Sequence, residues 1–185
     1  MRRNVFIFHG TAGYPEENWF PWLKHKLEAE GDQVFVPQFP MPEGQSAEAW
    51  FKILATYSDR INEQTVFVGH SLGGLFLLCV LEKLETPCAL AAFVGTPIGE
   101  KPILNYERDG AFCGFSFDWN KIKNNARQRI VFHSDNDPYV GLENGKKLAN
   151  HLGVKLNFVP QAGHFNKAAG YTQFEELYAL LKSHA

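Results

Sequence analysis

Short apolar runs alternate along this chain with segments whose apolar residues recur at helical spacing. The runs are continuous rather than alternating apolar and polar, which is typical of strands buried on both faces of a parallel sheet. The predicted strands are Val5–His9, Gln33–Pro37, Thr65–Gly69, Leu90–Gly95, Ile130–His133 and Leu156–Val159. The predicted helices are Trp19–Glu30, Ala47–Ile61, Leu72–Leu84, Leu142–His151 and Thr172–Lys182.

This regular alternation of strand and helix indicates right-handed crossovers between parallel strands. We therefore expect an α/β fold, a three-layer α/β/α sandwich around a mostly parallel sheet of about six strands. A chain of 185 residues is long enough to bury a good-sized core. Residues 1–185 show no internal repeat and no shift in composition that would mark a second domain, so a single domain is expected.

Residues 98–120 interrupt the alternation. They combine charged residues with Phe112, Phe115, Phe117 and Trp119, and they are long for a structureless connection inside a compact domain. Because aromatic residues on a loop need something to cover, we expect a short cap-like insertion over the functional site. The alternative is a surface loop that ends in a helix near Trp119–Asn125.

Composition and charge exclude several classes of protein. The net charge of −2, without a basic block, disfavours a nucleic-acid partner. The first residues lack the apolar stretch of a signal peptide and no apolar run is long enough to span a bilayer, so no membrane association is expected. Cys79, Cys88 and Cys113 lie in apolar surroundings, which predicts buried free thiols and a cytoplasmic location.

The segment Gly69–Gly73 reads Gly-x-Ser-x-Gly and is the strongest chemical signal in the chain. It directly follows a predicted strand and precedes a predicted helix, which is the context in which this motif forms a sharp turn that exposes the serine hydroxyl. Ser71 is therefore a candidate nucleophile for acyl transfer. No metal-ligand spacing and no phosphate-binding loop is present, so neither a metal nor another cofactor is expected.

A carboxylate and a histidine follow later strands, at the edge of the sheet where α/β proteins bind their ligands. The segment Ser134–Pro138 follows the fifth predicted strand, and Gln161–Phe165 follows the sixth. The chain order serine, aspartate, histidine is one of the known orders of a catalytic triad. His164 is the expected base, because an imidazole titrates near neutral pH and can both take and return a proton.

The other histidines are weaker candidates for the base. His133 lies in a predicted strand, His151 in a predicted helix and His184 at the chain terminus. His70, next to the serine, is expected to point away from it.

The acid partner of the histidine is Asp135 or Asp137, and the residues alone leave this choice nearly even. An oxyanion hole needs two backbone N–H groups. One is expected from Leu72, the residue after the serine, and the other from Thr11 in the Gly-rich loop after the first strand, with Ala12 as the second choice.

Five residues are candidates for the walls of the substrate pocket. Most large aromatic residues pack in cores, but Trp19 lies just beyond the expected oxyanion loop and three others lie in the interrupting segment. The predicted pocket residues are His9, Trp19, Phe112, Phe115 and Trp119.

Motifs spread over nearly the whole chain resemble the family of small serine hydrolases that includes YdeN and retinoblastoma-binding protein nine. The resemblance implies a compact α/β-hydrolase fold, and it implies that Asp137, directly before Pro138, is the catalytic acid. Many α/β-hydrolases have Val-Pro shortly after this aspartate, whereas this chain has Tyr139-Val140-Gly141 there. The motifs that carry the resemblance are Val5–Gly10, Asn18–Leu23, Gly69–Gly73, Phe117–Ile122, Ser134–Pro138 and Gly163–Phe165.

These features together predict a serine hydrolase that cleaves small acyl esters through an acyl-enzyme intermediate. An amidase or peptidase could use the same residues, and a protein-binding module could retain them on a hydrolase scaffold. The expected partner is a small acyl substrate. A protein partner is compatible with the sequence but not readable from it.

Overall fold

A parallel sheet forms the centre of the fold. The computed structural model describes residues 2–183, so His184, named above, lies outside the described residues. In this part of the chain the sheet has six strands in the order β2-β1-β3-β4-β5-β6, and every neighbouring pair is parallel. The strands are β1 (Asn4–Phe8), β2 (Gln33–Phe35), β3 (Val66–His70), β4 (Cys88–Val94), β5 (Ala126–His133) and β6 (Leu156–Phe158).

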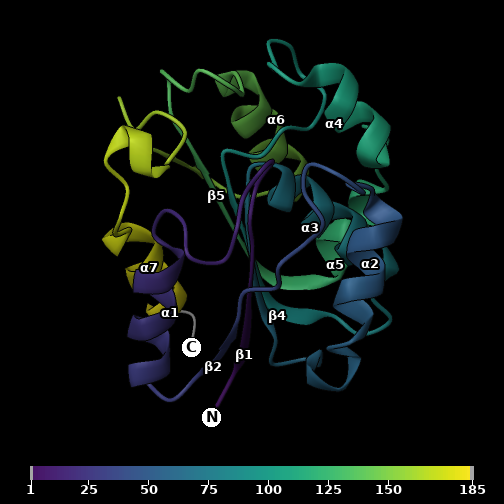
Figure 1. Cartoon of the computed structure of the whole chain (residues 1–185), viewed down its shortest axis with the longest axis vertical. Helices are drawn as coiled ribbons and strands as arrows, with labels where there is room; N and C mark the ends of the chain where they lie inside the picture. Colours follow the sequence, from purple (N-terminus) through teal and green to yellow (C-terminus); the bar gives the residue numbers. More distant parts are fainter. Residues whose placement is uncertain (1, 184–185) are drawn as a thin grey trace.

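Helices cover both faces of this sheet, which confirms the predicted three-layer α/β class (Figure 1). Helices α1 (Phe20–Ala29) and α7 (Glu175–Ser183) pack on one face. Helices α2 (Ala47–Ala55), α3 (Leu72–Lys83), α5 (Trp119–Asn124) and α6 (Leu142–Leu152) pack on the other. The short helices η1 (Ser58–Arg60) and η2 (Lys167–Ala169) lie in connections.

The core explains why the strands read as continuous apolar runs. Side chains of a strand point alternately to the two faces of a sheet, and here both faces are covered by helices. In β1, Val5 and Ile7 pack toward α1 and α7, whereas Phe6 and Phe8 pack toward α3. The register aligns Phe6 with Phe67 of β3, and their ring centroids lie 5.5 Å apart. Positions 5–8 of the strand are therefore all apolar.

The structure departs from the predicted elements mainly in two places. The predicted helix Ala47–Ile61 ends at Ala55, and η1 follows it as a separate turn. Residues 98–120 contain helix α4 (Tyr106–Cys113), which was not predicted, before α5 begins at Trp119. Helix α4 escapes a periodicity search because it is short and polar and buries only Asp109 and Phe112.

A buried ion pair fastens the start of the sheet. The guanidinium of Arg3 donates hydrogen bonds to both carboxylate oxygens of Asp32, the shortest at 2.6 Å. Its Nη1 donates to the Leu181 carbonyl at 2.9 Å. Both side chains are almost fully buried. The pair thus joins the N-terminal segment, the loop before β2 and the last helix.

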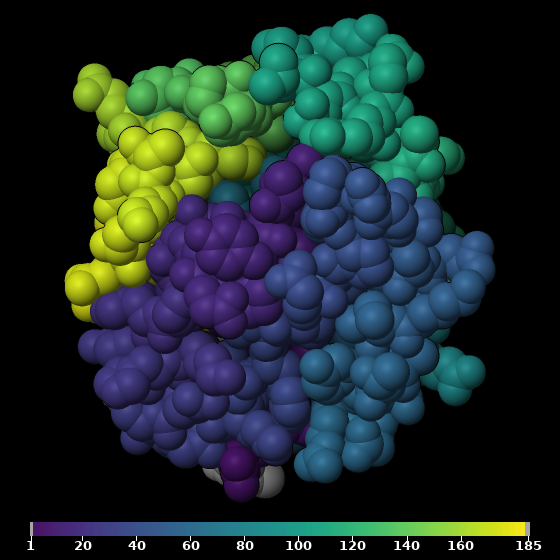
Figure 2. All heavy atoms as spheres, in the orientation of Figure 1, coloured from purple at the N-terminus to yellow at the C-terminus, as the bar shows by residue number. Residues whose placement is uncertain are grey.

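The strand order places a crevice at the carboxyl ends of β1 and β3. The chain leaves β1 toward β2 on one side, and β3 lies on the other side, so the connections diverge at this point and leave room for a ligand. Figure 2 shows the molecule hollowed at this edge, where the purple segment after β1 meets the green and yellow segments of the later strands. Helix α4 lies over the same edge (Figure 1).

Candidate active site

Ser71 occupies a sharp turn between β3 and α3. Its φ of 56° and ψ of −123° are strained for a residue with a side chain, and its N–H donates a hydrogen bond to the Val94 carbonyl at 2.8 Å. The turn is possible because α3 presses directly against the end of β1. A Cβ on Gly73 would overlap the Phe8 carbonyl oxygen and lie 2.6 Å from that of His9. Glycine is needed there for this close approach.

The loop after β1 lies against the serine. A Cβ on Gly10 would be only 2.9 Å from the Cβ of Ser71, so no larger residue fits without displacement. The Gly13 N–H donates to the Gly10 carbonyl at 3.1 Å, which forms a tight turn around Thr11. Leu72 is the first residue of α3, so its N–H has no carbonyl one turn back in the helix. The two amides expected to form an oxyanion hole therefore belong to the two segments that contact the serine.

His164 and Asp137 form a short hydrogen bond. The Asp137 Oδ2 lies 2.6 Å from the His164 Nδ1, and since a carboxylate can only accept, Nδ1 carries the proton. The Asp137 Oδ1 accepts the N–H groups of Tyr139 and Val140 at 2.9 and 3.0 Å. Burial acts to raise the pKa of Asp137, but its hydrogen bond to His164, the charge of His164 and the two amides outweigh burial and lower it. This leaves Nε2 of His164 available to act as a base.

Asp135, the alternative acid, has a different environment. It is exposed, and its Oδ1 accepts the Gln161 N–H at 2.8 Å. The neighbouring Asn136 Oδ1 accepts the Gly163 N–H at 2.7 Å. Asp135 and Asn136 therefore join the loop after β5 to the loop that carries His164, while Asp137 alone of the three makes the hydrogen bond to the imidazole.

Three buried histidines hold the loops of this edge in place. The His70 Nε2 donates to the His164 carbonyl at 2.8 Å, and the His133 Nε2 donates to the Val140 carbonyl at 2.9 Å. The His9 Nδ1 donates to the Gly10 carbonyl at 2.9 Å, while its Nε2 accepts the Phe39 N–H at 3.1 Å. Burial lowers the pKa of each imidazole. The lowered pKa favours the neutral form of each ring, and the hydrogen bonds of His9 require it, because its Nε2 accepts.

The pKa of His70 is strongly lowered. Burial lowers its pKa to about 3, and the neighbouring charge of His164 acts in the same direction. The ring centroids of the two histidines lie 4.8 Å apart. His70 thus supports His164 through its backbone carbonyl and adds no positive charge beside it. This role of His70 could not be predicted from the sequence, because the Gly-x-Ser-x-Gly motif does not show which later loop contacts the residue before the serine.

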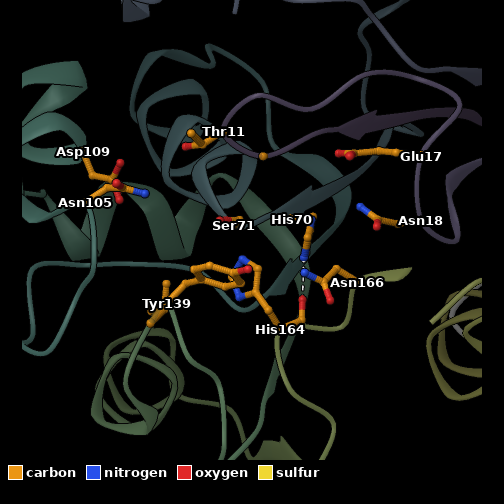
Figure 3. A pocket seen from close by; sticks show the side chains of 12 residues that line it. Thr11, Glu17, Asn18, His70, Ser71, Asn105, Asp109, Tyr139, His164 and Asn166 are labelled. Atoms are coloured by element: carbon orange, nitrogen blue, oxygen red, sulfur yellow. Dashed lines mark hydrogen bonds between the residues drawn. The ribbon is translucent and has the colours of Figure 1, made fainter. Parts of the chain in front are cut away.

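A cavity of about 250 Å³ joins these groups (Figure 3). Ser71 and His164 both line it, as do side chains from the segment after β1, from α4 and from the loops after β5 and β6. Its lining is mainly polar. The lining residues are Gly10, Thr11, Glu17, Asn18, His70, Ser71, Asn105, Asp109, Tyr139, Val140, His164 and Asn166.

The five predicted pocket residues do not line this cavity. His9 and Trp19 are fully buried beneath it, and the Trp19 Nε1 donates to the Phe165 carbonyl at 2.9 Å. Phe112 packs on Trp50 with ring centroids 4.9 Å apart. Phe115 packs on Tyr106 within the 98–120 segment, and Trp119 stacks on His151 of α6.

The physical reason is that each of these rings has a packing or hydrogen-bond partner within the fold, whereas the lining of the cavity is mainly polar. Six residues that line the cavity were not predicted to do so: Glu17, Asn18, Asn105, Asp109, Tyr139 and Asn166. One signal was available for two of them. Asn105 and Asp109 are spaced four residues apart, so on a helix they share one face.

Two carboxylic acids of the cavity have raised pKa values. Burial raises the pKa of Glu17 to about 7, against a backbone hydrogen bond at Tyr14 that lowers it. Burial also raises the pKa of Asp109 to about 6, although the charges of Arg108 and His164 act to lower it. Among residues 2–183, no group of three or more His, Cys, Asp or Glu is arranged to hold a metal ion. No helix in that range is long and apolar enough to cross a membrane.

Comparison with known proteins gives matches along nearly the full chain. A family model described as serine hydrolase matches residues 5–183. The hydrolase YdeN of Bacillus subtilis is 32% identical over 184 residues, covering all of this chain and 97% of the relative. The serine hydrolase RBBP9 of Rattus norvegicus is 25% identical over 177 residues, covering 95% and 90%. The crystal structure of YdeN superposes with a TM-score of 0.91 over 98% of each chain.

Proposed function

Because this chain belongs to the serine hydrolase family, we propose that it cleaves small carboxylic esters through Ser71, His164 and Asp137. One observation carries the proposal. The hydrogen-bonded pair of His164 and Asp137 opens onto the same cavity as a serine held on a strained strand-to-helix turn. A base oriented by a carboxylate beside an exposed hydroxyl is the arrangement that activates a serine.

The first half of the reaction acylates the serine. The Nε2 of His164 takes the hydroxyl proton of Ser71 while Oγ bonds to the acyl carbon, and the carbonyl electron pair moves onto oxygen. The N–H groups of Leu72 and Thr11 are proposed to donate to that oxyanion. When the carbonyl reforms, the ester C–O bond breaks, and the leaving alcohol takes the proton from His164. The acyl group then remains on Ser71.

The second half returns the serine. A water molecule gives one proton to His164 as its oxygen bonds to the acyl carbon, and the same two amides receive the oxyanion. The Ser71 Oγ leaves with the proton from His164, and a carboxylic acid is released. Asp137 remains ionised throughout, since its lowered pKa favours the carboxylate, and it stabilises the imidazolium in both halves.

The hydrogen bonds around His164 support this role. Asp137 orients the ring from Nδ1, and the neutral His70 holds the backbone of the same residue. The ring of Tyr139 packs edge-on against His164 with centroids 4.9 Å apart. A base held from three sides needs little reorganisation when the proton moves.

The proposal is tested with a fluorophosphonate probe and a series of 4-nitrophenyl esters of increasing acyl length. The protein should be labelled once and should turn over the shorter esters, and Ser71→Ala should abolish both. Ser58→Ala, which changes an exposed serine in η1, is the matched control and should retain both. Full activity in Ser71→Ala would refute the assignment. Matched 4-nitroanilides, run beside the esters, measure whether amides are cleaved by the same serine.

A further inference from the structure

Asp109 is a buried carboxylate that lacks a partner within the described chain. It lies on α4, is 5% exposed and lines the same cavity as Ser71. Its Oδ1 is buried without a hydrogen-bond partner among residues 2–183. Figure 3 shows Asp109 on one side of Ser71, with Glu17 on the opposite side. Burying an unpaired carboxylate oxygen is costly, so a partner supplied by a ligand would relieve that cost.

The other almost fully buried aspartate in the described chain, Asp32, has the kind of charged partner that Asp109 lacks. Asp32 is 7% exposed, and Arg3 donates to both of its oxygens. No such donor reaches the Oδ1 of Asp109. The charges that act on Asp109 are those of Arg108 on the same helix and His164 across the cavity, and they do not prevent burial from raising its pKa to about 6. Above that pH the group is mainly ionised.

The cavity as a whole has the charge character of a site for a cation. Its described lining includes the carboxylic acids Glu17 and Asp109 but neither lysine nor arginine. The amide side chains of Asn105 and Asn166 supply neutral polar contacts on either side of Ser71. A positively charged group in the cavity would therefore meet the carboxylate of Asp109, and Arg108, whose charge also acts on that carboxylate, does not line the cavity.

We propose that Asp109 binds a positively charged group of the substrate, so that the preferred substrates are small esters that carry an ammonium group. This inference rests on the proposed ester hydrolysis at Ser71. An ammonium group in the cavity would give this carboxylate the positively charged partner that it lacks, through a charge-assisted hydrogen bond or, when quaternary, through an ion pair. Asp109 is then a specificity residue, and the bonds made and broken at Ser71 are unchanged.

The test compares cationic esters with neutral esters of the same shape. One pair is acetylcholine and 3,3-dimethylbutyl acetate, which places the charge in the alcohol. The other pair is the β-alanyl and butyryl esters of 4-nitrophenol, which places the charge in the acyl group. The protein should favour the cationic member of at least one pair in kcat/KM. Asp109→Asn should reduce that preference by about tenfold or more, because kcat/KM should fall further for the cationic ester than for the neutral one.

Two variants control for structural effects. Glu107→Gln removes a negative charge from the exposed side of the same helix turn and should leave the preference unchanged. Asp109→Ser, together with melting temperatures of all variants, separates loss of charge recognition from loss of folding.

A second measurement is the preference for acetylcholine over its neutral analogue as a function of pH. It should fall as the pH is lowered through about 6, because Asp109 takes up a proton while the quaternary charge does not change.

The outcomes distinguish this inference from the proposed function. If neutral esters are hydrolysed but neither pair shows a preference that depends on Asp109, the inference is refuted and ester hydrolysis stands. An equal loss for both members of a pair in Asp109→Asn also refutes it. If no ester is hydrolysed, calorimetric binding of choline to Ser71→Ala, with and without Asp109→Asn, decides the matter. Binding weakened about tenfold by the second substitution supports charge recognition, and unchanged or absent binding refutes it.

Discussion

Replacing His70 by glutamine should make the protein less sensitive to acid. The glutamine amide can still donate to the His164 carbonyl, but it cannot take up a proton. In the folded protein, burial lowers the pKa of His70 from 6.5 to about 3. The unfolded state therefore binds a proton below about pH 6.5 that the folded state does not bind, and the free energy of unfolding falls as the pH falls toward 3.

The expected size follows from this difference. Each pH unit between the two pKa values changes the free energy of unfolding by roughly 1.4 kcal/mol for one buried imidazole. Between about pH 8 and about pH 5, His70 should account for about 2 kcal/mol of lost stability. His9 and His133 act in the same direction, and Glu17 and Asp109, whose pKa values are raised, act in the opposite one, so only a difference between variants isolates His70.

The assay is urea unfolding followed by tryptophan fluorescence at both pH values. The loss of stability from high to low pH should be about 2 kcal/mol smaller in His70→Gln than in the unmodified protein. His25→Gln, at an exposed position of α1, is the matched control and should leave the loss unchanged. If His70→Gln and the unmodified protein lose the same stability on acidification, His70 is not a buried neutral imidazole and the reasoning fails.

Three further changes test the site and the fold. Asp137→Asn should lower ester turnover roughly 1,000-fold or more, because the imidazole loses its charged partner, whereas Asp135→Asn should change it by a few-fold; steady-state kinetics of both variants decide between the two acids. Gly10→Ala places a Cβ 2.9 Å from that of Ser71 and should slow fluorophosphonate labelling by about tenfold. The labelling rate is compared with that of the unmodified protein under conditions in which both are equally folded. Asp32→Asn should reduce the free energy of unfolding by about 3 kcal/mol, since it leaves a buried guanidinium without its carboxylate, whereas removing the exposed carboxylate of Glu48 should leave the urea midpoint unchanged.

Much of the fold could be predicted from the sequence because its signals are local. Runs such as Val66–Val68 are apolar at every position, and this pattern is typical of a strand that is buried on both faces. The motif at Ser71 likewise records a backbone conformation, since Gly73 is needed where α3 approaches the end of β1 and Gly69 where β3 approaches the start of α3. The element ends were less predictable, because polar α4 is stabilised by its place in the fold rather than by an apolar stripe.

The sequence by itself determined the parallel α/β class and the positions of Ser71, His164 and the acidic loop after β5. Only the tertiary structure decided which side chains share the cavity. Asp109 reaches it from α4, and His70 meets the backbone of a loop far along the chain, while the aromatic candidates turn into the core. The physical reason is that a residue pattern records burial and backbone geometry, whereas a cavity forms where distant loops meet at one edge of the sheet.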